Sequence, residues 1–273
     1  MTVHAFFDEA TNSVSYIVAD LDTRTAAIID PVLGFDPASG RVDSRPVDAM
    51  LDAASAQGLT IAWTLETHVH ADHLSAGDHV RRRMGAKLAV GAGIREVQGE
   101  FAPRFGIEDL KPDGRDFDRL LNDGDVLPLG QLAIRVMATP GHTPACVTYV
   151  IGDSAFVGDT LFMPDFGTAR TDFPGGDARE LYRSIQRILS LPRETRLFMC
   201  HDYKAPGRER FAWETTVGEQ RDRNVHIGGA VAEGDYVAMR EARDATLKPP
   251  KLLEQALRVN IRGGGAATGM TAA

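Results

Sequence analysis

The most informative segment of the chain reads Thr67-His68-Val69-His70-Ala71-Asp72-His73. Three imidazoles and one carboxylate fall within six consecutive positions, directly after the apolar run at residues 59–65, which predicts a strand. If that strand continued, His68 and His70 would project to the same side, because alternate strand residues share a face. Asp72 and His73 would then lie on the following turn and could face the same point. No turn needs three imidazoles for its own stability, so the cluster indicates a metal site.

Three later segments also place histidine or aspartate directly after a predicted strand. They are residues 139–142 (Thr-Pro-Gly-His), 157–160 (Val-Gly-Asp-Thr) and 199–203 (Met-Cys-His-Asp-Tyr). A lone histidine at a strand end is more often a hydrogen-bonded turn residue than a ligand, so each segment alone predicts little. Together with the histidine-rich segment, however, these three segments become candidate metal ligands, because a complete set of ligands needs donors from elsewhere in the chain. The potential ligands are then His68, His70, Asp72, His73, His142, Asp159 and His201.

Around these motifs, short β-rich runs alternate with helical patterns, which is typical of an α/β protein. Residues 15–19 and 25–29 are expected to form a hairpin. The predicted helices are 47–58, 75–85 (opened by a capping box at 75–78) and 178–191, with further helix after 211, and the predicted strands are 59–65, 87–90, 132–137, 147–151, 155–157 and 196–200. Residues 34–46 are expected to be a loop, and residues 94–121 an insertion of helix and loop.

The composition is that of a soluble globular protein: of 273 residues, 43% are hydrophobic and 25% are charged. We expect a single domain over residues 1–262 with C-terminal helices, and a flexible tail over 263–273. The formal net charge of -8 argues against a nucleic-acid partner. The sequence shows no apolar run of the ~20 residues that span a bilayer, no export signal and only two cysteines, so we predict no membrane association and a cytoplasmic location.

In this order, the histidine-rich segment and the three later segments resemble the signature of the metallo-beta-lactamase fold superfamily. The resemblance implies an αββα sandwich, in which two mixed β-sheets pack face to face, helices flank them and the metal site lies at one edge. Within the superfamily, residues 141–149, 157–162, 167–173 and 200–203 resemble the persulfide dioxygenase (sulfur dioxygenase) branch. The sequence is most similar there to the bacterial beta-lactamase-like-hydrolase group, which residues 214–224 also resemble.

The resemblance to that branch implies an enzyme that oxidises glutathione persulfide with O2 to sulfite and glutathione, in sulfide detoxification. It also implies one Fe(II) per chain, with His68, His142 and Asp159 as ligands. The residue types agree with this, because two histidines and one carboxylate form the facial triad of non-haem Fe(II) oxygenases and leave positions open for persulfide and O2. The same donors also suit Zn or Mn.

Three further residues are candidates around the metal. Arg170 resembles the substrate-side arginine of the branch and could pair with a glutathione carboxylate; the alternative is a structural salt bridge to Asp172 or Asp165. Tyr203 could reach the bound substrate with its hydroxyl; the alternative is a core tyrosine with a satisfied hydroxyl. Asp202 is expected to orient a strand or a metal ligand from behind.

The same ligand set leaves other functions open. The seven potential ligands could hold two metals about 3.5–4 Å apart, as in a dinuclear hydrolase of glutathione thioesters resembling glyoxalase II. The second metal would then be bound by His70, Asp72, His73 and His201. With a single metal, these four residues would instead lie behind its ligands and orient them. A third possibility is a metal-loaded regulatory or binding module without turnover. We expect a homodimer, because related folds often pair.

Overall fold

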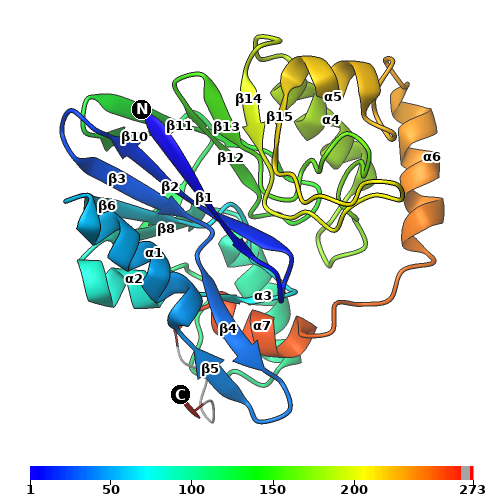
Figure 1. The fold of residues 1–273 in the computed structure, drawn as a ribbon. Helices are drawn as coiled ribbons and strands as arrows, with labels where there is room; N and C mark the ends of the chain where they lie inside the picture. The colour runs from blue at the N-terminus through cyan, green and yellow to red at the C-terminus, as the bar shows by residue number, and fades with distance from the viewer. Residues whose placement is uncertain (266–270, 273) are drawn as a thin grey trace.

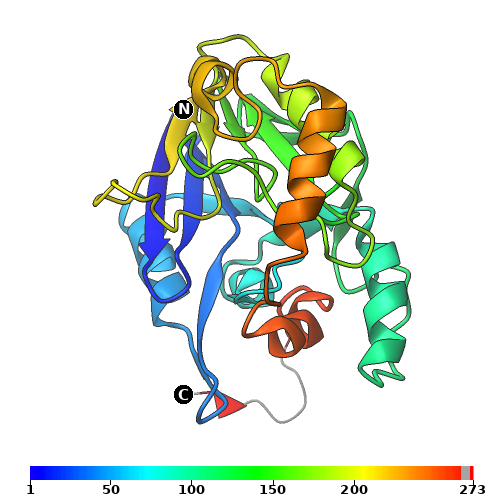
Figure 2. The ribbon, with the colours of Figure 1, turned by 90° about the vertical axis from the view of Figure 1, so that its right-hand side faces the viewer.

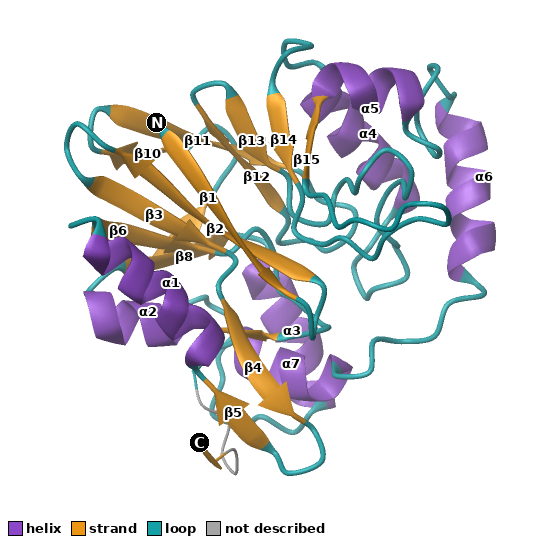
Figure 3. Ribbon diagram, viewed as in Figure 1, coloured by secondary structure: helices purple, strands orange, loops and turns teal. Residues whose placement is uncertain are grey.

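The computed structural model describes residues 1–265 and 271–272. Two six-stranded β-sheets pack face to face, and helices cover their outer faces (Figure 1, Figure 3). This arrangement confirms the predicted αββα sandwich with two mixed sheets. A smaller sheet with the order β16-β5-β4-β7 extends from one end; its strands are β4 (Val32–Asp36), β5 (Arg41–Asp43), β7 (Leu74–Ser75) and β16 (Thr271–Ala272).

The first large sheet has the order β1-β2-β3-β6-β8-β9. Its strands are β1 (Thr2–Asp8), β2 (Ser13–Asp20), β3 (Thr25–Ile29), β6 (Thr60–Leu65), β8 (Lys87–Gly91) and β9 (Arg119–Leu121). The first three strands are antiparallel, whereas β3, β6, β8 and β9 run parallel. The carboxyl ends of these parallel strands therefore lie at one edge of the sheet.

The second large sheet has the order β10-β11-β12-β13-β14-β15. Its strands are β10 (Val126–Leu129), β11 (Leu132–Ala138), β12 (Val147–Ile151), β13 (Ser154–Phe156), β14 (Arg196–Phe198) and β15 (Glu214–Thr216). Only the β13–β14 pair is parallel among the pairs of this sheet. The consecutive antiparallel strands β10 to β13 are joined by short connections, whereas the parallel pair β13–β14 needs a crossover, which carries α4 (Ala178–Leu189).

Strand β2 shows why both faces of the first sheet are buried. Val14, Tyr16 and Val18 point into the core between the two sheets, while Ile17 and Ala19 point to the outer core beneath the helices. This is the two-residue alternation of a strand with apolar residues on both faces. Residues 16–19 of β2 therefore form an unbroken apolar run rather than an alternating one.

Helices cover both outer faces of the sandwich. The helices are α1 (Arg45–Ala56), α2 (Gly77–Met84), α3 (Ile94–Arg104), α4 (Ala178–Leu189), α5 (Val217–Arg223), α6 (Glu233–Asp244) and α7 (Leu253–Asn260). Apolar residues of α1, α2 and α7 pack on the first sheet, and those of α4, α5 and α6 on the second. In Figure 2, α6 (orange) lies along the side of the second sheet and α7 (red) lies below it. Residues 245–252 connect them as an extended strap (Figure 1).

Several element predictions need correction. The predicted loop at residues 34–46 is wrong, because β4 and β5 form an antiparallel pair there. The predicted capping box at residues 75–78 is also wrong: α2 begins at Gly77, and the Ser75 hydroxyl donates to Glu66 (2.5 Å) instead. The structure also contains strands β1, β10 and β15, which the sequence analysis does not predict. The insertion at residues 94–121 contains α3 as expected, and it ends in β9, which extends the first sheet.

The predicted tail at residues 263–273 falls partly outside the described residues. Gly263 and Gly264, which are described, are buried, and a Cβ on Gly263 would meet Leu88 at 2.5 Å. Gly263 therefore packs against the first sheet, and Gly264 lies beside Ser75 and the start of α2. Among the helices of the described residues, none is long and apolar enough to cross a membrane.

Helix α6 is fastened to the loop at residues 167–172 by a buried ion pair. The Arg240 guanidinium donates to Asp244 Oδ1 (2.5 and 3.0 Å), and both residues are at most 5% exposed. Arg240 also donates to the Thr168 carbonyl (3.2 Å), and Asp244 Oδ2 accepts from the amide and the hydroxyl of Thr171 (2.8 and 3.0 Å). The pair thus holds the helix and the loop in one arrangement.

A second contact to the same loop involves a histidine. His226 Nδ1 accepts from the amide (3.0 Å) of Thr168 and contacts its hydroxyl (3.2 Å), and the Tyr236 hydroxyl donates to the same threonine oxygen (2.9 Å). Burial, assisted by the charges of Arg240 and Arg243, lowers the pKa of His226 from 6.5 to about 4. The imidazole is therefore neutral at pH 7, as its role as an acceptor requires.

Replacing Asp244 with Ala would leave the Arg240 guanidinium buried without its counter-ion. We expect the free energy of unfolding to fall by about 3–5 kcal/mol, the usual penalty for breaking a buried ion pair. Urea titration followed by circular dichroism measures the change. Glu241→Ala, at an exposed position of the same helix, is the control and should change the value by less than about 0.5 kcal/mol. Equal effects of the two substitutions would contradict the anchoring role.

The low pKa of His226 makes a pH dependence testable. Between pH 6.5 and about 4 the unfolded chain takes up a proton that folded His226 excludes, so the stability of the protein decreases as the pH falls through this window. His226→Asn keeps a hydrogen-bond acceptor and does not titrate. We expect the Tm of the variant, measured by differential scanning calorimetry, to decrease less between pH 7 and pH 5 than the Tm of the unchanged protein. Identical losses would show that His226 does not contribute.

Candidate metal centre

Four chain segments meet at the edge where strands of the two sheets end. Residues 67–73 follow β6, the segment with His142 follows β11, the segment with Asp159 follows β13, and His201 follows β14. Because strand ends are rigidly held by their sheets, side chains that follow them are held in fixed relative positions. All seven potential ligands predicted from the sequence lie at this edge.

The first cluster consists of His68, His142 and Asp159. One donor atom from each lies within 4.8 Å of the others. Asp159 Oδ2 is 3.8 Å from His68 Nε2 and 3.7 Å from His142 Nε2. All three residues are at most 9% exposed. These are the three residues that the resemblance implied as iron ligands, and the structure brings them together.

Hydrogen bonds orient both imidazoles of this cluster. His142 Nδ1 donates to the Arg170 carbonyl (2.8 Å). The Thr67 hydroxyl donates to Asp30 (2.8 Å), so its oxygen is left to accept from His68 Nδ1 (3.0 Å). With each Nδ1 protonated, each Nε2 carries a lone pair directed at the carboxylate of the cluster. Burial also lowers the pKa of His68 well below its ordinary value, which keeps this imidazole neutral.

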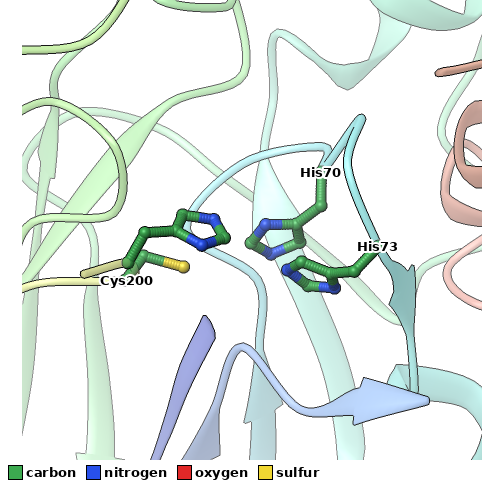
Figure 4. Close-up of side chains that lie close together, drawn as sticks. His70, His73 and Cys200 are labelled. Atoms are coloured by element: carbon green, nitrogen blue, oxygen red, sulfur yellow. The ribbon is translucent and has the colours of Figure 1, made fainter. Parts of the chain in front are cut away.

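The second cluster consists of His70, His73, Cys200 and His201, whose donor atoms also lie within 4.8 Å of one another. Figure 4 shows His70, His73 and Cys200 directed toward a common point. Burial, assisted by the charge of His70, lowers the pKa of His73 to about 3. The predicted ligand Asp72 lies beside this cluster, with Oδ2 3.4 Å from His201 Nε2.

Unpartnered acceptor atoms lie in both clusters. His201 Nδ1 lies 3.2 Å from the Ser13 hydroxyl and 3.3 Å from the Asn12 carbonyl; when it donates to that carbonyl, its Nε2 carries a lone pair, and Asp159 Oδ1 lies 3.5 Å from this nitrogen. Within the described part of the chain, these two atoms and His73 Nε2 are buried and have no hydrogen-bond partner. Each such atom costs about 1–3 kcal/mol. Acceptors that face one another without a hydrogen between them fit a bound cation, so the donor set suits a metal ion.

His70 differs from the other histidines because carboxylates surround its second nitrogen. Its Nε2 lies 3.2 Å from Asp30 Oδ1 and 3.3 Å from Glu66 Oε2. Burial opposes a charge on His70, but these carboxylates raise its pKa well above the ordinary value. Sequence analysis did not select Asp30 or Glu66. The available signal was their position, since Asp30 directly follows β3 and Glu66 directly follows β6.

A cavity of about 320 Å³ opens onto the first cluster. Its wall contains His68, His142 and Asp159. Asp72 also reaches this wall, whereas His70, His73 and His201 do not line it. The volume lies within the range of small-molecule sites. A ligand in the cavity therefore meets the first cluster directly.

The rest of the wall is aromatic and cationic. Phe162, Phe166 and Tyr203 line the cavity. The Tyr203 ring stacks on the imidazole of His201, with centroids 5.4 Å apart and planes at 13°. Tyr203 is 40% exposed, so it is not a core tyrosine. Tyr203 thus lines the cavity, and its contact to a substrate stays a prediction.

Arg170 lines the cavity and also forms the salt bridge considered as the alternative. Its guanidinium donates to both oxygens of Asp172 (2.6 Å each) and to the Lys248 carbonyl (2.8 Å). Asp165, the other possible partner, pairs with Arg208 instead (2.6 Å).

Asp202 organises the loop that carries Tyr203. Its carboxylate accepts from Arg208 (2.6 Å) and from the backbone amides of Lys204 and Ala212 (3.2 and 2.7 Å). These contacts hold the loop at residues 203–212, and the role of Asp202 in orienting a strand or a metal ligand stays a prediction.

Comparisons with known proteins agree with this architecture. The sequence model of the Metallo-beta-lactamase superfamily matches residues 9–201. A beta-lactamase hydrolase-like protein of Xylella fastidiosa is 53% identical over 96% of this chain, which spans 60% of that relative's length. Glyoxylase B2 of Dictyostelium discoideum is 44% identical over 91% of this chain and 86% of that protein.

Two further comparisons involve proteins named ETHE1. The mitochondrial persulfide dioxygenase ETHE1 of Homo sapiens is 30% identical over 94% of this chain and 87% of that protein. The crystal structure of ETHE1 from Myxococcus xanthus superposes with a TM-score of 0.77 at 30% identity, covering 97% of this chain and all of that one. The family match covers most of the chain, and the structural match covers nearly all of it. The chain therefore belongs to the metallo-beta-lactamase superfamily.

Proposed function

We propose that this protein is a persulfide dioxygenase that oxidises glutathione persulfide with O2 to sulfite and glutathione, with one Fe(II) held by His68, His142 and Asp159. The observation that carries the proposal is that these three donors form a cluster of their own and face the cavity. Two imidazoles and one carboxylate are the donor set of non-haem iron oxygenases. The similarity to the human and Myxococcus xanthus proteins supports the same assignment.

When bound, Fe(II) supplies open coordination positions and the electrons that ground-state O2 needs. The overall reaction balances when glutathione persulfide, O2 and one water give glutathione, sulfite and two protons. The outer sulfur is oxidised, the sulfur–sulfur bond breaks and O2 is reduced. The thiol of glutathione leaves with a proton.

The protein's own residues orient the ligands and shape the substrate site. Thr67 and the Arg170 carbonyl fix the two imidazoles with Nε2 directed inward. Phe162 and Phe166 give the cavity apolar walls, which limit the access of water to the persulfide. The Tyr203 hydroxyl is the polar group that the aromatic side of the wall offers to a bound substrate.

A dinuclear hydrolase of glutathione thioesters is the second candidate. The observation that favours it is the second cluster, with His73 and His201 beside Asp72 and Asp159. The relative named glyoxylase B2 supports the same alternative. It would require a second metal, which His70, Asp72, His73 and His201 would hold, with Asp159 lying close to both clusters. We prefer the dioxygenase because His68, His142 and Asp159 all line the cavity, whereas His70, His73 and His201 do not.

Parallel assays distinguish the two functions. We expect the Fe(II)-reconstituted protein to consume O2 and form sulfite when given glutathione persulfide, with no hydrolysis of S-lactoylglutathione by the same sample. An oxygen electrode, sulfite analysis and thioester absorbance measure the three quantities, and metal analysis should give one iron per chain. Thioester cleavage without O2 uptake, with two metals per chain, would establish the hydrolase instead.

Thr67 provides a test of the metal-orienting hydrogen bonds. Thr67→Val keeps the shape of the side chain and removes the acceptor for His68 Nδ1. We expect affinity for Fe(II) to fall about 10- to 100-fold, the usual effect of losing such a partner. Thr67→Ser keeps the hydroxyl and is the matched control. Anaerobic titration with a competing chelator measures the affinity, and equal affinities of the two variants would refute this role.

A further inference from the structure

The negatively and the positively charged residues of the cavity wall belong to different parts of the structure. Its carboxylates, Asp72 and Asp159, belong to the metal-binding edge, and its three arginines are Arg170, Arg240 and Arg243. The first two arginines are buried or half-buried, whereas Arg243 is exposed. Since His68 and Asp159 are buried, the first cluster forms the inner end of the cavity and Arg243 lies at its mouth.

Only one of these arginines keeps its charge free for a ligand. Asp244 neutralises Arg240 (2.5 Å), and Asp172 neutralises Arg170 (2.6 Å). Arg243 has no ion-pair partner among the residues described in the structure. A bidentate guanidinium without a counter-ion is a strong binding group for a carboxylate.

The anchor of α6 fixes the position of Arg243 on the cavity wall. Arg240 and Arg243 are three residues apart on the helix and therefore lie on neighbouring positions of one side. Arg240 is bonded to Asp244 and to the Thr168 carbonyl, so this side of α6 is held against the loop at residues 167–172. Leu247 and Pro250, on the strap after α6, continue the wall at the mouth. The helix and the strap lie outside the residues 9–201 that the superfamily model matches.

We infer that Arg243 is a specificity-determining residue, which binds a carboxylate of the substrate at the cavity mouth while the sulfur end of the substrate faces His68, His142 and Asp159. The inference rests on the proposed function, which supplies a thiol-derived substrate. Arg243 would favour small persulfides that have a carboxylate remote from the sulfur over persulfides that have no carboxylate. Glutathione persulfide has two such carboxylates, whereas the persulfide of a simple amine or alcohol thiol has none.

Calorimetric titration with S-methylglutathione tests this without relying on turnover. The Fe(II)-loaded full chain is titrated anaerobically as the unchanged protein, Arg243→Ala, Arg243→Lys and Arg221→Ala. Arg221, an exposed arginine on α5 that does not line this cavity, is the matched control. We expect Kd to rise about three- to tenfold for Arg243→Ala, less for Arg243→Lys and not at all for Arg221→Ala. The difference should shrink at high salt, because the contact is exposed.

A second ligand separates charge recognition from packing. The diethyl ester of S-methylglutathione has no free carboxylate, so the unchanged protein and Arg243→Ala should bind it equally. Three outcomes would overturn the inference. Arg243→Ala could bind S-methylglutathione with an unchanged Kd, its Kd for the diethyl ester could rise as much as its Kd for S-methylglutathione, or the unchanged protein could fail to bind S-methylglutathione. Failure of the proposed function looks different, because the unchanged protein would then bind S-methylglutathione and yet consume no O2 with the persulfide.

Discussion

The metal-binding edge depends on the buried carboxylate of Asp30. It accepts hydrogen bonds from the amide and hydroxyl of Thr67 (2.7 and 2.8 Å) and lies 3.2 Å from His70 Nε2. Its backbone has φ +49°, a conformation that costs a non-glycine residue about 1–2 kcal/mol. Hydrogen bonds from the Asp30 amide to the Leu65 carbonyl (2.9 Å) and from the Ser15 hydroxyl to the Asp30 carbonyl (2.7 Å) hold it there. One acidic side chain at the end of β3 thus positions the histidine-rich segment and sets the tautomer of its first histidine.

The two sheets are also joined directly at the ligand-bearing segments. The Tyr149 hydroxyl of the second sheet donates to the Glu66 carbonyl (2.7 Å), and the Tyr16 hydroxyl of the first donates to the Met199 carbonyl (2.5 Å). Each tyrosine belongs to the core between the sheets, so packing of the core and placement of the ligands depend on the same side chains. This explains how donors that are far apart in the sequence reach one point without help from a flexible loop.

The sequence locates the ligands better than it locates what orients them. A ligand-bearing segment is recognisable because histidines and aspartates directly follow apolar runs. Asp30 and Glu66 also directly follow strands, but their roles cannot be predicted from that position, because these roles arise only when β3 and β6 become neighbours in the sheet. The capping-box pattern at residue 75 fails for the same reason, since Glu66 takes the Ser75 hydroxyl. Likewise, the helical pattern of α6 does not reveal that Arg240 is buried and paired while Arg243 is exposed.

The positions of the ligands alone do not select the chemistry. Asp159 lies between the two clusters, with Oδ2 directed at His68 and His142 and Oδ1 directed at His201. The same carboxylate can therefore complete a mononuclear site or bridge two metals. What differs between the clusters is access, because the cavity exposes only the first cluster and Asp72 to a ligand. The aromatic residues before α4 and Arg243 of α6 line this same cavity, so the selection of substrate that we propose depends on elements beyond the shared metal-binding motif.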